Sequence, residues 1–347
     1  MKSTNRNVTR VDVARRAGVS VATVSYVLND GPRGVSAETK ARVLEAVEEL
    51  GYFPSEVARS LRTSRTLTIG LIVTDIVNPF HAMVARGVEE EARRSGYTVI
   101  QCNSDEDRGQ ELTYLRVLQS KRVDGIILVP TGGNVAYISQ MIEDGWPVVQ
   151  VDRKLEGLQT DSVVMDNVHG AYEAVTHLIK LGHRRIALVG APTALTPGQE
   201  RRQGYEKALH EAGIPVDTSL ICESNYKGED TLELVGDFWD SSTQVSAVFA
   251  ATNMLAFKVM AALKRRGLSI PNDVSLCVFD DPAYYELLSP SITAVRCDIP
   301  ALARQAFELL VERMYERGPE SDPVHVVMPC ELMVRESTQE VHDALAH

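Results

Sequence analysis

Two patterns of hydrophobic positions divide the chain near residue 67. The first part holds short segments with apolar residues at helical spacing, whereas the second alternates near-continuous apolar runs with amphipathic segments. Continuous apolar runs are typical of parallel strands that are buried on both faces. The pattern therefore predicts a small helical head followed by a larger α/β core.

The head is predicted to contain three short helices. Thr9 and Asp12 form a capping box at the first helix, and Ser20 and Ser36 are N-caps for the second and third. Gly18 permits the positive φ that a tight turn between the first two helices requires. The residues expected to pack the helices together are Val13, Ala14, Ala17, Val24, Val27, Leu28, Val43, Leu44, Val47 and Leu50.

The remaining face of the second helix carries small or polar side chains. Such a face suits close approach to base edges in a DNA major groove, so DNA binding is the first functional hypothesis. Its residues are Val21, Ala22, Thr23, Ser25 and Tyr26. Residues 55–62 then form at most a two-turn helix, too short to be stable alone in water, and a polar linker follows.

The core repeats one pattern twice. Strands are expected at 68–74, 97–100, 123–129 and 147–151, and again at 185–189, 220–222, 247–250 and 274–279. Helices are expected between them at about 78–95, 108–121, 134–144, 168–181, 198–212, 228–239 and 254–266. This alternation predicts two lobes, each built on a doubly wound parallel sheet.

The expected domains follow from these elements. They are a helix-turn-helix head at 1–53, a hinge helix and linker at 54–66, and a two-lobed core at 67–347. A last helix at about 300–317 and a strand near 324–328 return to one or both lobes. The N-lobe is expected to cover about 67–166 with 298–326, and the C-lobe about 167–297 with 327–340.

Charge is distributed unevenly along the chain. The whole chain has a formal net charge of −11, of which residues 1–66 carry +4 and the remainder −15. A basic head on an acidic core places any contact with phosphate groups at the head. The polar N-terminus and the lack of long apolar runs predict a cytoplasmic protein, nucleoid-associated when bound to DNA. Five dispersed cysteines without a C-x-x-C pair are interpreted as reduced thiols that mostly fill the core: Cys102, Cys222, Cys277, Cys297 and Cys330.

Polar side chains follow several predicted strands in both lobes. Ligands of open α/β sheets bind beyond the carboxyl ends of the strands, so these residues predict a small polar ligand, such as a sugar, between the lobes. The alternative is that Asp and Asn simply favour turns. The residues at these strand ends include Asn78, Phe80, Asn103, Thr131, Asp152, Arg153, Asn253 and Asp280.

Enzymatic and metal-binding interpretations find little support. The sequence contains no G-x-S-x-G elbow, no P-loop and no G-x-G-x-x-G after a strand. Asp280 and Asp281 are better explained as a turn and a ligand acceptor than as an acid/base pair. His169, His177 and His183 lack a Cys or acidic partner, so surface or capping roles are expected. We therefore predict neither an enzyme nor a bound metal or cofactor.

Short motifs occur in a fixed order along the chain. They include DVA (12–14) and AGVSVATVS (17–25), ARSLRT (58–63), NPF (78–80), VDG (123–125), GH (182–183), FDD (279–281) and REST (335–338). On these motifs the chain resembles the LacI/GalR (lac repressor) family of transcriptional regulators over nearly its whole length. The core motifs are also similar to those of periplasmic sugar-binding proteins.

The resemblance implies binding to double-stranded DNA. Two protomers would pair through their cores, with a tetramer left open, and each head would read half of a pseudo-palindromic operator. Residues 54–61 would be a hinge helix that orders on DNA, with Leu61 wedged into the minor groove and Ala58 one turn earlier; a packing role for Leu61 is the alternative. Tyr26 replaces a common Arg, so a different base preference is expected. The implied DNA contacts are Thr9, Ser20, Val21, Ala22, Thr23, Ser25, Tyr26, Asn29, Ala58 and Leu61.

The resemblance also implies an effector site. Asn253 replaces a frequent Asp, and its amide both donates and accepts hydrogen bonds, which is compatible with a sugar hydroxyl. Cys297 and Asp298, which follow an expected strand at 293–295, replace a commoner Gln-Pro, so contacts from that segment stay open. The implied effector residues are Asn78, Phe80, Asn103, Asp152, Arg201, Asn253 and Asp280.

The sequence thus favours a repressor whose operator affinity is controlled by a small polar effector, a sugar or sugar derivative. A ligand-binding module of transport type without DNA function stays as the alternative. Whether the effector releases or promotes DNA binding is left open, because one scaffold serves both behaviours.

Overall fold

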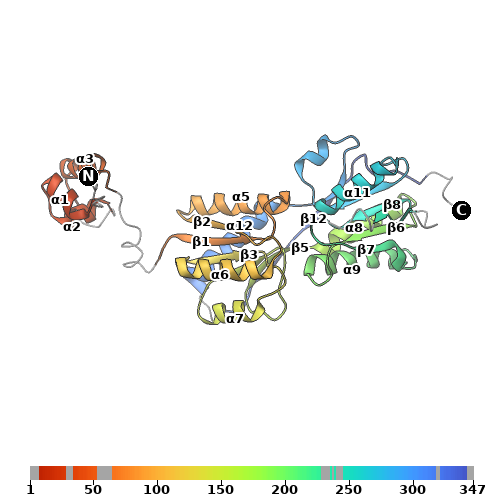
Figure 1. Cartoon of the computed structure of the whole chain (residues 1–347), viewed down its shortest axis with the longest axis horizontal. Helices are drawn as coiled ribbons and strands as arrows, with labels where there is room; N and C mark the ends of the chain where they lie inside the picture. Colours follow the sequence, from red (N-terminus) through yellow and green to blue (C-terminus); the bar gives the residue numbers. More distant parts are fainter. Residues whose placement is uncertain are drawn as a thin grey trace, which may run out of the picture. The chain divides into compact units, whose positions relative to one another are not determined.

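The computed structural model describes residues 8–28, 34–52, 65–227, 235–236, 238–239, 245–317 and 321–341. The chain divides into two compact units, Met1–Thr66 and Leu67–His347. Figure 1 traces the helices and strands of both. We call the first unit the head and the second the core, and describe each by itself.

The head contains α1 (Arg10–Ala17), α2 (Val21–Leu28) and α3 (Ala37–Leu50). The predicted capping box between Thr9 and Asp12 is confirmed, and Gly18 has a φ of 66°. The hydroxyl of Ser20 accepts a hydrogen bond from the backbone N–H of Thr23 (3.0 Å), so this predicted N-cap is confirmed as well. Each cap satisfies helix N–H groups that would otherwise lack a partner.

The predicted hydrophobic core of the head is confirmed except at Leu44. Val13, Val24 and Val43 are completely buried, but Leu44 is 46% exposed. Ala46 is buried in its place, because positions three apart, not adjacent ones, share a helix face. The head therefore has a small hydrophobic core of its own.

The core unit consists of two lobes, and the predicted fold class is confirmed. The N-lobe sheet has the order β11-β5-β4-β3-β1-β2, and all of its strand pairs are parallel. Its strands are β1 (Thr68–Val73), β2 (Thr98–Asn103), β3 (Gly125–Leu128), β4 (Val148–Val151), β5 (Asp161–Met165) and β11 (His325–Met328). Its helices are α5 (Pro79–Arg94), α6 (Arg108–Lys121), α7 (Val135–Glu143) and α12 (Ile299–Glu312).

The C-lobe sheet has the order β12-β10-β9-β8-β6-β7, in which only the pair of β10 and β12 is antiparallel among the described strands. Its strands are β6 (Ile186–Gly190), β7 (Ile221–Glu223), β8 (Ala247–Ala250), β9 (Ser275–Phe279), β10 (Thr293–Cys297) and β12 (Cys330–Met333). Its helices are α8 (Asn167–Lys180), α9 (Thr196–Glu211) and α11 (Asn253–Arg265), with the short 3-10 segments η1 (Thr218–Leu220) and η2 (Ala283–Leu287). Most of the helix expected at 228–239 lies outside the described residues.

The lobes differ from the sequence-based prediction at two strands. Strand β5 was not predicted, because it follows β4 through a loop without a helix and so breaks the alternation of strand and helix. Strand β12 was not predicted either, because it lies at the edge of its sheet and Glu331 interrupts its apolar residues. Strand β11 continues to Met328, so the chain returns to the C-lobe at Pro329, slightly later than expected.

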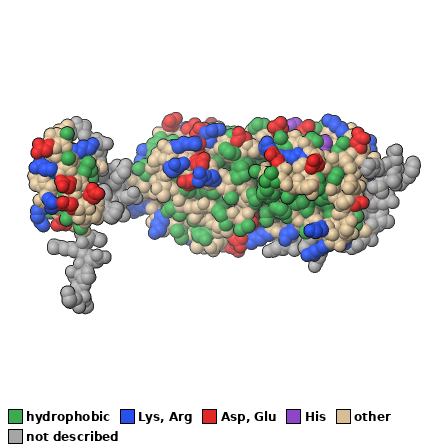
Figure 2. All heavy atoms as spheres, turned by 90° about the horizontal axis from the view of Figure 1, so that it is seen from above, with side chains coloured by type: hydrophobic (Ala, Val, Ile, Leu, Met, Phe, Trp, Pro, Cys, Tyr) green, Lys and Arg blue, Asp and Glu red, His purple; other side chains and the backbone are tan. Residues whose placement is uncertain are grey.

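Three chain segments connect the lobes: one between β5 and α8, one between β10 and α12, and one between β11 and β12. We call them the crossovers. Figure 2 shows hydrophobic side chains gathered on the side of the core that carries α5, where the two lobes meet. Within the described ranges, no helix is both long and apolar enough to cross a membrane.

A buried ion pair holds the ends of the N-lobe elements together. The carboxylate of Asp161 on β5 is completely buried and accepts two hydrogen bonds from Arg313 (2.7 and 2.9 Å) and one from the N–H of Val324 (2.7 Å). Burial alone would raise the pKa of Asp161, but these hydrogen bonds and the charges of Arg313 and Arg317 lower it. The ion pair joins β5 to the π-helical segment η3 (Arg313–Arg317), and the bond with Val324 joins β5 to the segment that leads into β11.

We expect Arg313→Ala to lower the free energy of unfolding by about 3 kcal/mol, the low end for a broken buried pair, because the Asp161 carboxylate then keeps only the longer contact with Arg317 (3.2 Å) and the N–H of Val324. The control is Arg86→Ala, which removes an exposed pair with Glu90 and should cost no more than about 0.5 kcal/mol. Because the native pKa of Asp161 is depressed, its contribution is present above the unfolded value of about 3.9 and is lost as the pH falls. Urea unfolding at pH 7 and in acid measures the loss of stability in each variant and its dependence on pH. Equal losses of unfolding free energy for the two variants at pH 7 would contradict a stabilising role for the Arg313–Asp161 pair.

Candidate DNA-reading head and effector cleft

Some predicted DNA-contacting residues at the second helix of the head are exposed to solvent, and others form hydrogen bonds within the head. Val21 is 42% exposed, Ala22 is also exposed, and Tyr26 is half-buried. The hydroxyls of Ser20 and Thr23 bind each other (2.8 Å), so they stabilise the start of α2. Thr9 is likewise bound to Asp12 through its hydroxyl (2.6 Å).

Other predicted DNA contacts have different positions. Ser25 is half-buried on α2. Asn29, Ala58 and Leu61 lie outside the described residues. The exposed apolar surface at the start of α2 is therefore the part of the predicted reading face that the described head presents directly.

In the core, two aspartates occupy equivalent positions in the two lobes. Asp152 follows β4 and Asp280 follows β9, each directly after the carboxyl end of its strand. Both adopt a positive φ, 67° and 75°, which is unusual for a residue other than glycine. Backbone strain of this kind costs on the order of 1–3 kcal/mol and concentrates at functional sites.

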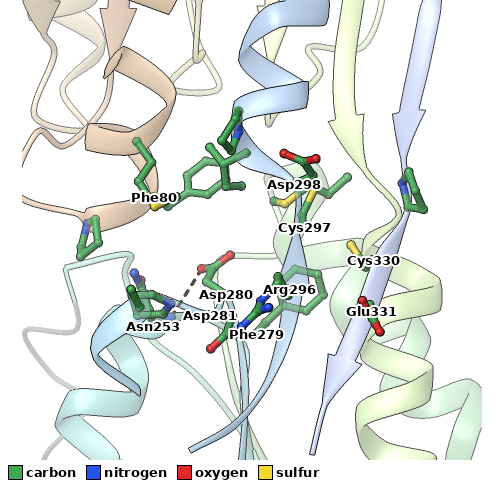
Figure 3. Close-up of a pocket in the computed structure, with 18 of the residues that line it drawn as sticks. Phe80, Asn253, Phe279, Asp280, Asp281, Arg296, Cys297, Asp298, Cys330 and Glu331 are labelled. Atoms are coloured by element: carbon green, nitrogen blue, oxygen red, sulfur yellow. Dashed lines mark hydrogen bonds and ion pairs between the residues drawn. The ribbon is translucent and has the colours of Figure 1, made fainter. Parts of the chain in front are cut away.

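An amide pair connects the lobes at this level. Asn78 caps α5, and its side-chain oxygen accepts hydrogen bonds from the N–H of Phe80 and from the amide of Asn253 at the start of α11 (both 3.0 Å). The N–H of Asn253 lies 3.5 Å from the carboxylate of Asp280. Figure 3 shows Phe80 on one side of the cavity, opposite Asn253 and Asp280.

Arg201 on α9 organises the C-lobe side. Its guanidinium lies over the ring of Phe279 (3.7 Å to the centroid), donates to the side chain of Asn167 (2.9 Å) and to the carbonyl of Ala251 (2.6 Å), and lies 3.9 Å from Asp280. The side chain is almost completely buried. Its donors are thus directed mainly to groups of the protein itself.

Arg153 has the corresponding role on the N-lobe side. It forms two hydrogen bonds with Glu106 (2.7 and 2.8 Å), and its guanidinium lies 4.1 Å from the ring centroid of Tyr226 in the C-lobe. His81 lies 3.9 Å from Asp152. The two buried arginines therefore each have a carboxylate and an aromatic ring as neighbours.

These surroundings shift the pKa values of Asp152 and Asp280 in opposite directions. Burial opposes ionisation of Asp152, but its hydrogen bond with His81 and the charges of Arg153 and Arg201 lower its pKa overall. Burial raises the pKa of Asp280, and the charge of Arg201 offsets this only in part because the charge of Asp152 adds to the increase. Of these two aspartates, Asp280 is the one whose charged form the protein disfavours.

Two hollows open beside this polar cluster. The larger, about 640 Å³, is lined by Phe80, Asn253, Asp280 and residues of the crossovers. The smaller, about 370 Å³, is lined by residues that include Glu106, Thr131 and Tyr226. Several buried polar atoms here have no hydrogen-bond partner among the described residues: Thr131 Oγ1, Arg153 Nε, Tyr226 Oη and Asn253 Oδ1.

The structure thus brings together most of the predicted effector residues but not Asn103. The side-chain oxygen of Asn103 accepts from the N–H of Ile76 (3.0 Å), and the residue lines neither hollow. Sequence reasoning assigned no role to Glu106 or Tyr226. Neither follows a predicted motif, and the pairing of Glu106 with Arg153 becomes visible only in three dimensions.

Other polar residues singled out in the sequence have structural roles. Asp281 is buried and binds Arg296 and Arg335 (2.7 and 2.8 Å). The expected surface or capping role of His183 is wrong, because this residue is buried and contacts Ser246 (2.9 Å) and the carbonyl of Gln339 (3.1 Å). Among the described residues, no group of three or more His, Cys, Asp or Glu side chains is placed to hold a metal ion.

Comparison with known proteins decides the family. Residues 10–55 match the model for bacterial regulatory proteins of the lacI family, and residues 175–338 match the periplasmic binding protein-like domain. The chain is 35% identical to catabolite control protein A of Priestia megaterium, covering 96% of this chain and 100% of that protein. It is 33% identical to the regulator DegA of Bacillus subtilis (strain 168), over 94% and 97%. The chain belongs to the lacI family.

Solved structures agree with this assignment. The complex of the regulator CelR with cellobiose has a TM-score of 0.72 at 30% identity, covering 95% of this chain and 99% of that one. A LacI family regulator from Enterococcus faecium with bound ribose has a TM-score of 0.69 at 30% identity, over 79% and 100%. The operator-bound lac repressor dimer, at 24% identity and a TM-score of 0.83 over 96% and 100%, shows the shared fold.

Family membership also decides between the functional classes. The chain is a DNA-binding transcriptional regulator, repressor-like in type, and the alternative of a transport module without DNA function is set aside. The relatives are regulators rather than enzymes. The resemblance inferred from the head and core motifs is therefore confirmed.

We expect Asp280→Asn to raise the melting temperature of the ligand-free protein by a few degrees at pH 7. A native pKa above the unfolded value means that ionising Asp280 costs stability as the pH rises, and an amide avoids this cost. The gain should vanish near pH 3, where the aspartate is protonated in both states. The matched control Asp281→Asn, one residue away, should instead lower the melting temperature, because Arg335 loses a charged partner. A lower melting temperature for Asp280→Asn at pH 7 would contradict the prediction.

Proposed function

We propose that the chain is a dimeric repressor whose affinity for a pseudo-palindromic operator is controlled by a small, uncharged, carbohydrate-like effector bound between the lobes. The observation that carries this proposal is that buried polar atoms at the two hollows, Asn253 Oδ1 and Tyr226 Oη, have no hydrogen-bond partner among the described residues. A buried polar atom without a partner is costly, so a ligand rich in hydroxyl groups would relieve such costs.

Charge argues for an uncharged effector. Arg153 is neutralised by Glu106, and Arg201 lies among Asp280, Asn167 and a backbone carbonyl. An anionic ligand would have to displace these contacts and approach Asp152 and Asp280. The cellobiose and ribose complexes among the similar structures support a carbohydrate effector. The two regulators bind different sugars, so they do not identify the sugar for this chain.

Exposed apolar surface supports dimer formation through the core. Val77 is 77% exposed before α5, and Met83 on α5 is 44% exposed. In the C-lobe, Phe257 and Leu287 are 41% and 85% exposed. Contiguous apolar surface on the side of α5 (Figure 2) is typical of a protein–protein interface, and a second copy would cover it.

We infer that the effector acts by changing the relative population of lobe arrangements. Asn78 and Asn253 form a hydrogen bond across the cleft. A ligand between the lobes would either replace this hydrogen bond or add further bonds to the two amides. Coupling between two sites in a protein is typically about 1–3 kcal/mol, or a 5- to 150-fold change in DNA affinity. The proposal leaves the sign of that change to experiment.

We expect neutral sugars, and not their phosphates, to raise the melting temperature, because a ligand specific to the folded state stabilises it. A panel of paired sugars and sugar phosphates measured by thermal shift tests this. A hit should be lost in Asn253→Ala and kept in Asn103→Ala. A shift with a phosphorylated sugar alone would refute the uncharged effector. Gel shifts on operators selected from random DNA, with and without the hit, test control of DNA binding; a hit that leaves operator affinity unchanged would refute it.

We expect Tyr26→Arg to change the operator selected from random DNA at one position in each half-site. Arginine can bind guanine through two hydrogen bonds, whereas tyrosine offers one hydroxyl and a ring. Sequencing the selected pools for both proteins measures the change. The control is Arg15→Lys, on the exposed side of α1, which should leave the preferred sequence the same. An identical preference for Tyr26→Arg would refute a base-reading role for Tyr26.

A further inference from the structure

Two cysteines distant in sequence face each other at the crossovers. Cys297 is the last residue of β10 and Cys330 the first of β12, and the antiparallel register of these strands places them directly opposite. Both are half-buried and line the 640 Å³ hollow; Figure 3 shows them on the side of the cavity formed by the crossovers. The two thiols are close enough for Cys330 to raise the pKa of Cys297.

The geometry lies close to that of a disulfide. Directly opposed residues of an antiparallel pair have Cα atoms about 4.5 or 5.5 Å apart, within the range of about 4.4–6.8 Å that disulfides adopt. Their Cβ atoms are about 4.5–5.5 Å apart, so only a small approach is required. Both residues end the ladder, where Asp298 and Pro329 lead away into the N-lobe, so neighbouring ladder pairs constrain them from one side only.

The other cysteines in the core have different surroundings. Cys277 is completely buried on β9, and burial raises its pKa to about 12; Cys102 is also buried. Cys222 is half-buried on β7, at the opposite edge of the C-lobe sheet from β12. Cys297 and Cys330 are therefore the pair that combines mutual contact with access from the cavity.

We propose that Cys297 and Cys330 form a reversible oxidative modification site, a cross-strand disulfide that lines the effector cleft. A low-molecular-weight disulfide such as oxidised glutathione is the oxidant. One cysteine thiolate attacks a sulfur of the oxidant, and a thiolate of reduced glutathione leaves. The second cysteine then attacks the mixed disulfide and releases a second. Two protein thiols are oxidised, one glutathione disulfide is reduced, and the two thiol protons pass to the released thiolates.

The local chemistry keeps the resting state reduced. The neighbouring Cys330 side chain and burial raise the pKa of Cys297, so this thiol stays protonated at neutral pH. Because the thiolate is the attacking form, oxidation is slow and responds to a sustained oxidising shift. The disulfide would fix the spacing of two of the three crossovers and remove two thiols from the cavity wall. This last consequence rests on the proposed function, whereas formation of the bond does not.

The test uses the full-length protein, treated with oxidised glutathione under native conditions and analysed by intact mass and by peptide mapping without reduction. We expect the loss of two hydrogen atoms, a cross-linked peptide pair containing Cys297 and Cys330, and recovery with dithiothreitol. Cys297→Ser and Cys330→Ser should each form a mixed disulfide with glutathione at the remaining cysteine, and the control Cys222→Ser should behave like the original protein. Absence of the cross-link in the native protein, or a cross-link that joins other cysteines, would overturn the proposal.

A second measurement addresses the consequence for the cleft. Thermal shift with a sugar that binds the reduced protein is repeated after oxidation. We expect oxidation to decrease the shift in the original protein and in Cys222→Ser, but not in the double variant Cys297→Ser/Cys330→Ser, which has no thiol at this site. An unchanged shift in the cross-linked protein would overturn the coupling to the cleft. Because the mass measurement needs neither sugar nor DNA, failure of the proposed function and failure of the disulfide are distinguishable.

Discussion

The structure of the core depends on the burial of charge between its two lobes. Arg153 and Arg201 are almost completely buried. Arg153 pairs with Glu106 at 2.7 Å, whereas Arg201 lies over the ring of Phe279 and donates to Asn167 and to the carbonyl of Ala251. Removing such charges from water costs several kcal/mol each, and only close carboxylates and aromatic faces offset that cost. Two residues of this cluster, Asp152 and Asp280, adopt a positive φ, so the surrounding contacts must also offset backbone strain of about 1–3 kcal/mol at each.

Burial leaves one member of the cluster poorly satisfied, and this points to function. The charged form of Asp280 is disfavoured, and Asn253 beside it has a side-chain oxygen without a partner among the described residues. A fold selected only for stability would replace such groups with apolar ones. Their presence is explained if a ligand with hydroxyl groups completes the network, because stability is then partly exchanged for binding.

Much of the fold could be predicted from the sequence because local chemistry determines it. The caps at Thr9 and Ser20 and the continuous apolar runs of the core each depend on neighbours along the chain. The parts that escaped prediction depend on distant partners. They are contacts between residues that only the topology brings together. Glu106 pairs with Arg153, His183 contacts the carbonyl of Gln339 near the C-terminus, and Cys297 lies opposite Cys330. The order of the motifs along the chain predicted where the cleft lies, but not which buried charges pair with each other there.

The contacts that span the cleft are few and weak compared with the cores of the lobes. The backbone N–H of Lys154 donates to Thr196 (3.1 Å), and Lys227 pairs with Asp105, which is 61% exposed. Exposed ion pairs contribute about 0–1 kcal/mol and single hydrogen bonds about 0.5–1.5 kcal/mol. With the bond between Asn78 and Asn253 and the contact of Arg153 with the Tyr226 ring, which contributes about 2 kcal/mol when desolvated, the total is on the order of a few kcal/mol, comparable with the coupling energies of allosteric proteins. A ligand that makes only two or three hydrogen bonds in one lobe arrangement can therefore decide which arrangement is populated.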